Sequence, residues 1–180
     1  MELTRRDALA ALVSAGVVAG SGATALSRDV ATGGDRDSDA RVARAVDALV
    51  ATAEVVYPSA VGNTRAFVKT YAGTKLDERP AFREGAVETL TDLDAETRVT
   101  FDARFAALDP ADRDVALRRV GAGTADPDPE GTAAERVRYY FVNEVLYALY
   151  ASPTGGALVG IENPQGHPGG IDTYQRGSPE

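Results

Sequence analysis

Apolar residues recur at steps of three and four positions along most of this 180-residue chain. That spacing puts apolar side chains on one face of an α-helix, and no stretch alternates as a β-strand would. The clearest stripe lies between residue 38 and Val56, at Val42, Ala45, Val46, Leu49, Val50, Ala53 and Val56. The pattern therefore predicts an all-α fold, a small irregular bundle of about five helices with a Gly/Pro-rich C-terminal extension.

Turn and cap residues divide the rest of the chain. After the first helix, we expect helical segments at 64–71, 80–93, 94–107, 110–120 and 132–151. Gly73 is expected to close the first of these, and Asp109 followed by Pro110 to begin the fourth, with Val115 facing inward. Residues 121–131 are predicted to be an exposed loop. From Ser152 onward the chain is too rich in Gly and Pro for a helix to be expected.

The N-terminus has the pattern of an export signal. Arg5 and Arg6 precede an uncharged apolar stretch, Ala8–Ala25, that ends in small residues. An arginine pair in this position favours the twin-arginine route, which carries folded proteins. An uncleaved anchor, an ordinary secretory signal and a buried Ala-rich helix are the alternatives. The predicted domains are a signal peptide at 1–25, a flexible spacer at 26–37, a helical domain at 38–151 and an irregular tail at 152–180.

The charged residues are mostly acidic, and the basic ones are mostly arginine. The net charge is −8, and Lys69 and Lys75 are the only lysines among 19 basic residues. This composition resembles proteins of halophilic archaea, because excess surface charge keeps a protein soluble in concentrated salt. No basic stripe is apparent along the sequence to neutralise phosphates, so nucleic acid is not expected as a partner.

Few residues suited to catalysis or metal binding are present. The chain has no cysteine and a single histidine, His167, which excludes disulfides, thiolate sites and multi-histidine metal sites. Gly155, Gly156 and Gly160 only weakly suggest a phosphate loop, and residues 126–130 lack the spacing of a calcium loop. A small hydrolase or isomerase using His167 with Glu162 or Asp172 is the least favoured hypothesis. We therefore predict no catalytic residues, no metal and no cofactor in this chain.

The segment 132–151 is apolar around most of its circumference from Tyr139 on. Such a helix is either central in its own domain or covered by another protein. We assign a central position first and a partner contact second. Within it, Glu144 is expected to be a partly exposed or locally satisfied carboxylate rather than a perturbed acid.

The order of several short motifs resembles the gluconate 2-dehydrogenase subunit 3 family, over roughly residues 42–170. The motifs are Val56-Tyr57-Pro58, Leu90-Thr91-Asp92-Leu93-Asp94, Phe105 to Asp114, Tyr150 to Gly156 and Gly166-His167-Pro168-Gly169. Two features depart from the family pattern. Ala157 follows the glycine pair where Asn is usual, and His167 stands where the family has Tyr, with no tryptophan before it.

The resemblance implies a non-catalytic accessory subunit. Its partner would be a large FAD-dependent subunit of the glucose–methanol–choline (GMC) oxidoreductase type, which acts on a sugar or polyol and lacks its own signal. A cytochrome subunit often completes such a complex. The small subunit would support folding of the large one and take it through the twin-arginine translocase to the outside of the cell. The alternative is a stand-alone exported helical domain with an unknown ligand.

The expected interface with that partner combines the aromatic helix and the tail that follows it. Its predicted residues are Tyr139, Tyr140, Tyr147, Tyr150, Pro153, Gly155, Gly156, His167, Pro168 and Gly169.

Overall fold

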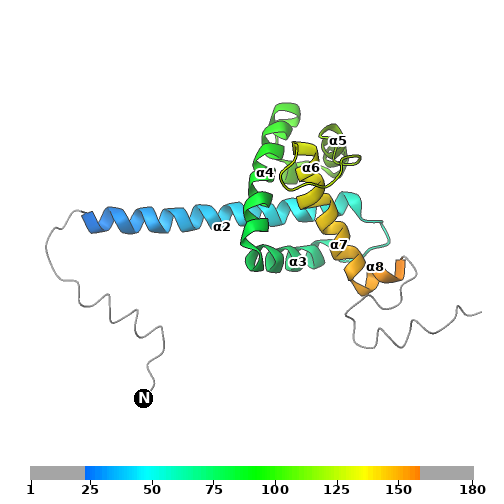
Figure 1. The fold of residues 1–180 in the computed structure, drawn as a ribbon, viewed down its shortest axis with the longest axis horizontal. Helices are drawn as coiled ribbons and strands as arrows, with labels where there is room; N and C mark the ends of the chain where they lie inside the picture. The colour runs from blue at the N-terminus through cyan, green and yellow to red at the C-terminus, as the bar shows by residue number, and fades with distance from the viewer. Residues whose placement is uncertain (1–22, 159–180) are drawn as a thin grey trace, which may run out of the picture. The chain divides into compact units, whose positions relative to one another are not determined.

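Helices form nearly all of the structure, a computed structural model that describes residues 23–158 (Figure 1). Contacts divide the chain after Asp39, and the packed core belongs to the unit that begins at Ala40. No strand occurs in residues 23–158, so the all-α prediction is confirmed. The elements in chain order are α2 (Ala23–Val56), α3 (Thr64–Glu78), α4 (Pro80–Phe101), a 3-10 turn η1 (Phe105–Ala107), α5 (Pro110–Arg119), α6 (Ala133–Val137), a π-helical segment η2 (Arg138–Asn143), α7 (Glu144–Ala151) and α8 (Pro153–Leu158).

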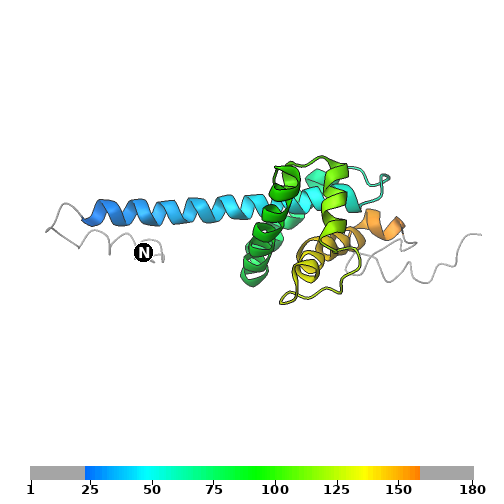
Figure 2. The same ribbon diagram turned by 90° about the horizontal axis from the view of Figure 1, so that it is seen from above.

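A single apolar cluster fills the interior of this unit. The segment formed by α6 and η2 lies against α4, while α3 contacts both α4 and α7 (Figures 1 and 2). The stripe on α2 is buried as its spacing predicts, with Leu49 and Ala53 almost fully covered. The largest fully buried apolar side chains are Phe105, Phe141, Leu49, Leu76, Leu149, Val68, Val137 and Val145.

Two helix starts follow directly from their cap residues. The Asp109 carboxylate accepts a hydrogen bond from the Asp112 N–H at 2.9 Å, and Pro110 occupies the first turn of α5. Thr132 and Glu135 form a reciprocal capping box at the start of α6. Both starts agree with the positions expected from the sequence.

The first helix is longer than predicted. It begins at Ala23 rather than near residue 38, so the segment 26–37, predicted as a flexible spacer, is helical. This segment has no proline, and Gly33 and Gly34 each cost a helix only about 1 kcal/mol relative to alanine. Among residues 23–158, no helix combines the length and apolar character needed to cross a membrane.

The helix predicted to end at Gly73 continues through it. α3 extends to Glu78, and its last turn buries Leu76 completely, which offsets the cost of an internal glycine. The expected segments 80–93 and 94–107 form one continuous helix, α4, which ends at Phe101 rather than near residue 107. Asp102 adopts a left-handed conformation at φ 56°, which stops α4 before η1.

On α5, Val115 does not face inward as predicted. Val115 is exposed, while Arg113, Ala116 and Leu117 are buried. These three residues follow the three- and four-residue steps of one helix face, which Val115 does not share.

The start of the predicted irregular tail is also helical. Pro153 begins α8, and the Ser152 hydroxyl accepts a hydrogen bond from the Gly155 N–H at 3.1 Å. A serine cap followed by proline in the first turn outweighs the two glycines that follow. Gly155 is required here, because a Cβ at this position would lie 2.0 Å from the Leu149 carbonyl oxygen.

Candidate interaction surface

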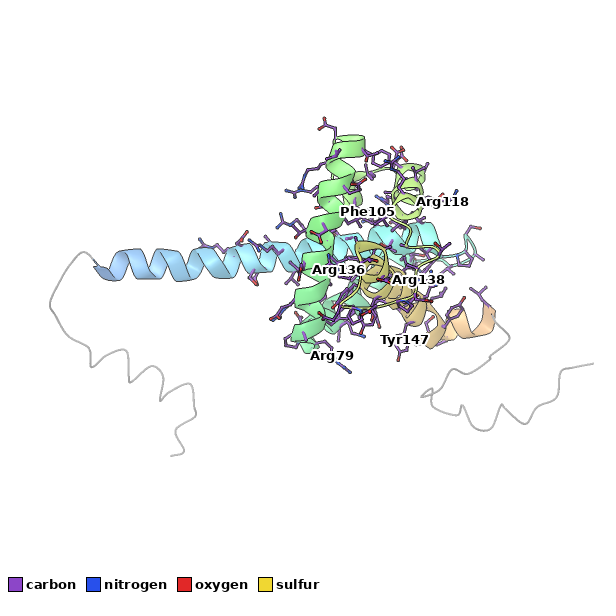
Figure 3. All side chains as sticks on the ribbon, turned by 45° about the horizontal axis from the view of Figure 1, so that its top comes forward. Arg79, Phe105, Arg118, Arg136, Arg138 and Tyr147 are labelled. Carbon is purple, nitrogen blue, oxygen red and sulfur yellow. The ribbon has the colours of Figure 1, made fainter. Side chains whose placement is uncertain are left out.

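Two of the tyrosines predicted to contact a partner are on the surface of α7. The Tyr147 side chain is 64% exposed and Tyr150 is 49% exposed, and their spacing of three residues places them on one face. Tyr139, on η2, is exposed to a lesser extent. Figure 3 shows Tyr147 on the outer side of α7. Exposed tyrosines of this kind are the residues that most often anchor protein interfaces.

Tyr140 is a core residue rather than a surface one. It is 6% exposed, and its ring packs edge-on to the Tyr139 ring and against the Phe82 ring. The distances between ring centres are 4.9 Å and 5.2 Å, respectively. Its hydroxyl lies over Gly85, where an added Cβ would come within 2.1 Å of the phenol oxygen. The glycine makes room for the ring, so Tyr140 is not available to a partner in this structure.

The prediction of one regular helix over 132–151 missed the π-helical segment. In η2 the helix widens between α6 and α7, and Tyr140, Phe141 and Val142 are all buried there. The segment that is apolar all round is therefore mostly absorbed by its own core. π-turns inside helices are frequent at functional sites.

The other predicted interface residues fall into three groups. Pro153 is exposed, whereas Gly155 and Gly156 are buried and do not form surface. His167, Pro168 and Gly169 lie outside the described residues, as do Arg5 and Arg6. Leu158, at the end of α8, is a further exposed apolar side chain that was not predicted.

A buried ionic cluster lies beneath Tyr147. The Glu144 side chain is only 8% exposed, and its Oε1 atom is 2.9 Å from Lys75 Nζ. The same oxygen accepts a hydrogen bond from the Tyr71 hydroxyl. Glu144 is therefore buried rather than partly exposed, and the partners of its carboxylate are not local in the sequence. Both partners, Lys75 and Tyr71, belong to α3, which packs against α7 although the two helices are distant in sequence.

Lys75 connects this buried carboxylate to the exposed aromatic ring. Its ammonium group lies 5.0 Å from the centre of the Phe82 ring and 5.8 Å from that of Tyr147. Cation–π contacts at these distances are favourable and hold the rings in place. We define the Tyr147 surface as Tyr139, Tyr147 and Tyr150, supported from below by Lys75 and Glu144.

Burial changes the titration of two tyrosines next to this cluster. Burial raises the pKa of the Tyr57 hydroxyl to about 12, and this O–H donates to the Val145 carbonyl oxygen at 2.6 Å. Burial also raises the pKa of Tyr71, and its hydrogen bond to Glu144 and the negative charge of that carboxylate raise it further. Both phenols therefore stay neutral in the folded protein above pH 10.

Stability should consequently fall at alkaline pH. A tyrosine in the unfolded chain loses its proton near pH 10, whereas folded Tyr57 keeps it to about pH 12, so the folded state binds more protons in this range. The free energy of unfolding then decreases as the pH rises from 10 to 12, by about 2–3 kcal/mol for this group. Urea unfolding at several pH values should show a shallower decrease for Tyr57→Phe. Tyr150→Phe, at an exposed position, is the control. If the free energy of unfolding falls with pH equally in Tyr57→Phe and in the wild type, the raised pKa of Tyr57 is contradicted.

The side chains of Tyr71, Lys75 and Glu144 are engaged with one another, and the Tyr147 surface itself presents aromatic rings. Within residues 23–158, no three His, Cys, Asp or Glu side chains gather as metal ligands would.

Sequence reasoning did not identify Tyr71, Lys75 or Phe82 as part of the site. One signal was available, because Tyr71 and Lys75 are four residues apart and so lie on one face of a helix. The prediction that this helix ends near Gly73 hid that relation, since Lys75 then fell outside it.

The structure is that of a small helical protein with exposed tyrosines on η2 and α7. The family model of gluconate 2-dehydrogenase subunit 3 matches residues 29–169 of the chain. The chain therefore belongs to the gluconate 2-dehydrogenase subunit 3 family, whose members are accessory subunits of a dehydrogenase complex. Comparisons with curated proteins and with solved structures gave no match.

Proposed function

We propose that this chain is the small, non-catalytic subunit of an exported FAD-dependent dehydrogenase of the GMC type that oxidises a sugar or polyol. The match to the family over residues 29–169 carries the proposal. In this arrangement the large subunit binds FAD and performs catalysis, and a cytochrome subunit accepts its electrons. The small subunit supports the folding of the large one.

The Tyr147 surface is the proposed contact with the large subunit. Tyr147 and Tyr150 offer large rings whose burial would release water, and aromatic anchors of this kind dominate interface energies. Lys75 restrains Tyr147 from below through a contact 5.8 Å from the ring centre. A ring that is already ordered loses less conformational entropy when a partner covers it.

Export by the twin-arginine route is the second part of the proposal. Arg5 and Arg6 would direct the folded complex through the translocase, so that one signal serves both subunits. The mature complex would then act outside the cell or on the outer face of its membrane. The net charge of −8 suits a protein that works in concentrated salt, as in a halophilic archaeon.

Purification of the tagged chain from its native host in high salt tests the complex directly. We expect a large protein in near-equal amount with the absorbance of a bound flavin, identified by mass spectrometry. A colourless monomer would contradict the accessory-subunit proposal and favour a stand-alone exported domain.

Substitution of the arginine pair tests the route of export. In cells with Arg5→Lys and Arg6→Lys, we expect both subunits and the dehydrogenase activity to remain inside, because the translocase requires the pair. Immunoblots of medium and cell fractions measure this for each subunit. Normal export of the large subunit in the variant would show that it does not depend on this signal.

A further inference from the structure

Arginine side chains from several parts of the fold gather around one cavity, although the chain as a whole is acidic. The cavity has a volume of about 360 Å³ and lies between α2, α4 and the η1–α5 segment. Its charged lining includes Arg44, Arg65, Arg104 and Arg113, against Asp47 and Asp94. A smaller cavity shares Arg44 and Asp94 with it and adds Arg41 and Arg98. Positive charge thus exceeds negative charge along this cleft, in a protein of net charge −8.

Arg113 is the buried member of this group. Its side chain is 10% exposed, and its Nη1 atom is 2.7 Å from Glu54 Oε2 while Nη2 donates to the Ala106 carbonyl oxygen at 3.0 Å. The buried Nε atom has no hydrogen-bond partner among the residues that the structure describes. A buried donor without a partner is costly unless an acceptor reaches it.

The nearby carboxylates form no hydrogen bond with Arg98 or Arg104 within the described residues. Glu54 is shared, since its Oε1 atom also pairs with Arg65 Nη2 at 2.8 Å. Asp94 uses Oδ1 to accept the Phe105 N–H at 3.0 Å. Its Oδ2 atom is 4.0 Å from both Arg98 Nη2 and Arg104 Nε, which is too long for a hydrogen bond.

Arg44 lines both cavities. Within the part of the chain that the structure describes, its guanidinium has no hydrogen bond or ion pair, although it is half-buried between α2 and α4. Each guanidinium offers five N–H donors in a planar fork that fits two oxygens of an anion. Arg44 and Arg104 therefore line the cavity with donors that lack an acceptor.

We propose that this cavity, the arginine cleft, binds a small organic carboxylate. The guanidinium groups of Arg44 and Arg104 would hold the two carboxylate oxygens, and Arg113 also lines the cavity. The remaining wall includes Ala51, Leu90 and Ala106, which suit a compact apolar body rather than a bare inorganic ion. A volume of about 360 Å³ is within the range of small-molecule sites. This proposal is independent of the proposed subunit role.

Titration calorimetry of the full chain with benzoate tests the arginine cleft. Benzamide is the neutral probe of the same shape, and inorganic phosphate is the anion without an apolar body. We expect benzoate to bind and benzamide to bind at least about tenfold more weakly, because benzamide cannot form charge-assisted hydrogen bonds with arginine. Phosphate should also bind at least about tenfold more weakly, because it has no apolar body to contact Ala51, Leu90 and Ala106. The salt concentration is the same in every titration, since chloride competes for the same donors.

Arg44→Gln should weaken benzoate binding about tenfold or more without changing the thermal unfolding midpoint, because Arg44 has no partner among the described residues to lose. Arg104→Gln is a second variant, at a half-exposed side chain, and should also weaken benzoate binding about tenfold or more. Arg118→Gln is the control, since that side chain is 75% exposed on α5 and pairs with Asp114. Undetectable benzoate binding, equal binding of benzamide, or an unchanged affinity in both cleft variants would overturn the proposal. Binding of phosphate in preference to benzoate would overturn the assignment to a carboxylate.

Discussion

Replacing Tyr147 and Tyr150 together by aspartate is expected to weaken binding of the large dehydrogenase subunit by about 100-fold or more. Both rings are exposed on one face of α7 and would be buried in the complex. The substitution removes two anchors and places two unpaired carboxylates in a surface that loses its water on binding. Pull-down of the tagged double variant, with flavin absorbance and mass spectrometry of the eluate, measures the effect.

The control for this experiment is Val99→Asp. Val99 is another large apolar side chain that is exposed, at 86%, but it lies on α4 and outside the Tyr147 surface. It introduces one surface carboxylate, against two in the double variant, without touching the proposed contact, so the large subunit should still co-purify. Circular dichroism establishes that each variant remains folded. Undiminished co-purification of the double tyrosine variant would show that the Tyr147 surface is not the interface.

Loss of the Lys75 charge is expected to lower the free energy of unfolding by about 3 kcal/mol. In Lys75→Met the Glu144 carboxylate stays buried but loses its only ion-pair partner among the described residues. Breaking a buried pair from one side costs about 3–5 kcal/mol, because a buried charge is left uncompensated. The hydrogen bond from Tyr71 remains, which favours the lower end of this range. Urea unfolding followed by circular dichroism measures the difference.

Two further variants separate the ion pair from the general loss of a lysine. Lys69→Met removes the other lysine of the chain, which is exposed on the same helix, and should change stability little. Adding Glu144→Gln to Lys75→Met removes the unpaired buried carboxylate and should recover part of the lost free energy of unfolding. If Lys69→Met and Lys75→Met are equally stable, the ion pair between Lys75 and Glu144 does not stabilise the folded protein.

The helical elements could largely be predicted because their signals are local. The caps at Asp109 and Thr132 and the apolar stripe ending at Val56 each involve residues within a few positions of one another. The errors arose where a local signal competed with a distant contact. Gly73 is a plausible helix end by itself, but burial of Leu76 in the core carries α3 onward.

The proposed binding surfaces were less predictable than the helices. Four tyrosines at helical spacing were indistinguishable in the sequence, yet packing over Gly85 buries Tyr140 while Tyr147 remains exposed. The ion pair between Lys75 and Glu144 joins residues on α3 and α7. The arginine cleft likewise assembles residues spread from Arg44 to Arg113, none of which forms a basic run in the sequence.

By itself, the sequence determined that this protein is helical, where most of its helices begin and end, and which family it belongs to. Those properties depend on the period of apolar residues, on caps and on the order of short motifs, which are all readable along one dimension. The tertiary structure alone decided which tyrosines reach the surface, which carboxylate is buried with a lysine, and where the arginines meet. These depend on how side chains from distant segments fill a shared interior, and that packing is not encoded in any single stretch of the chain.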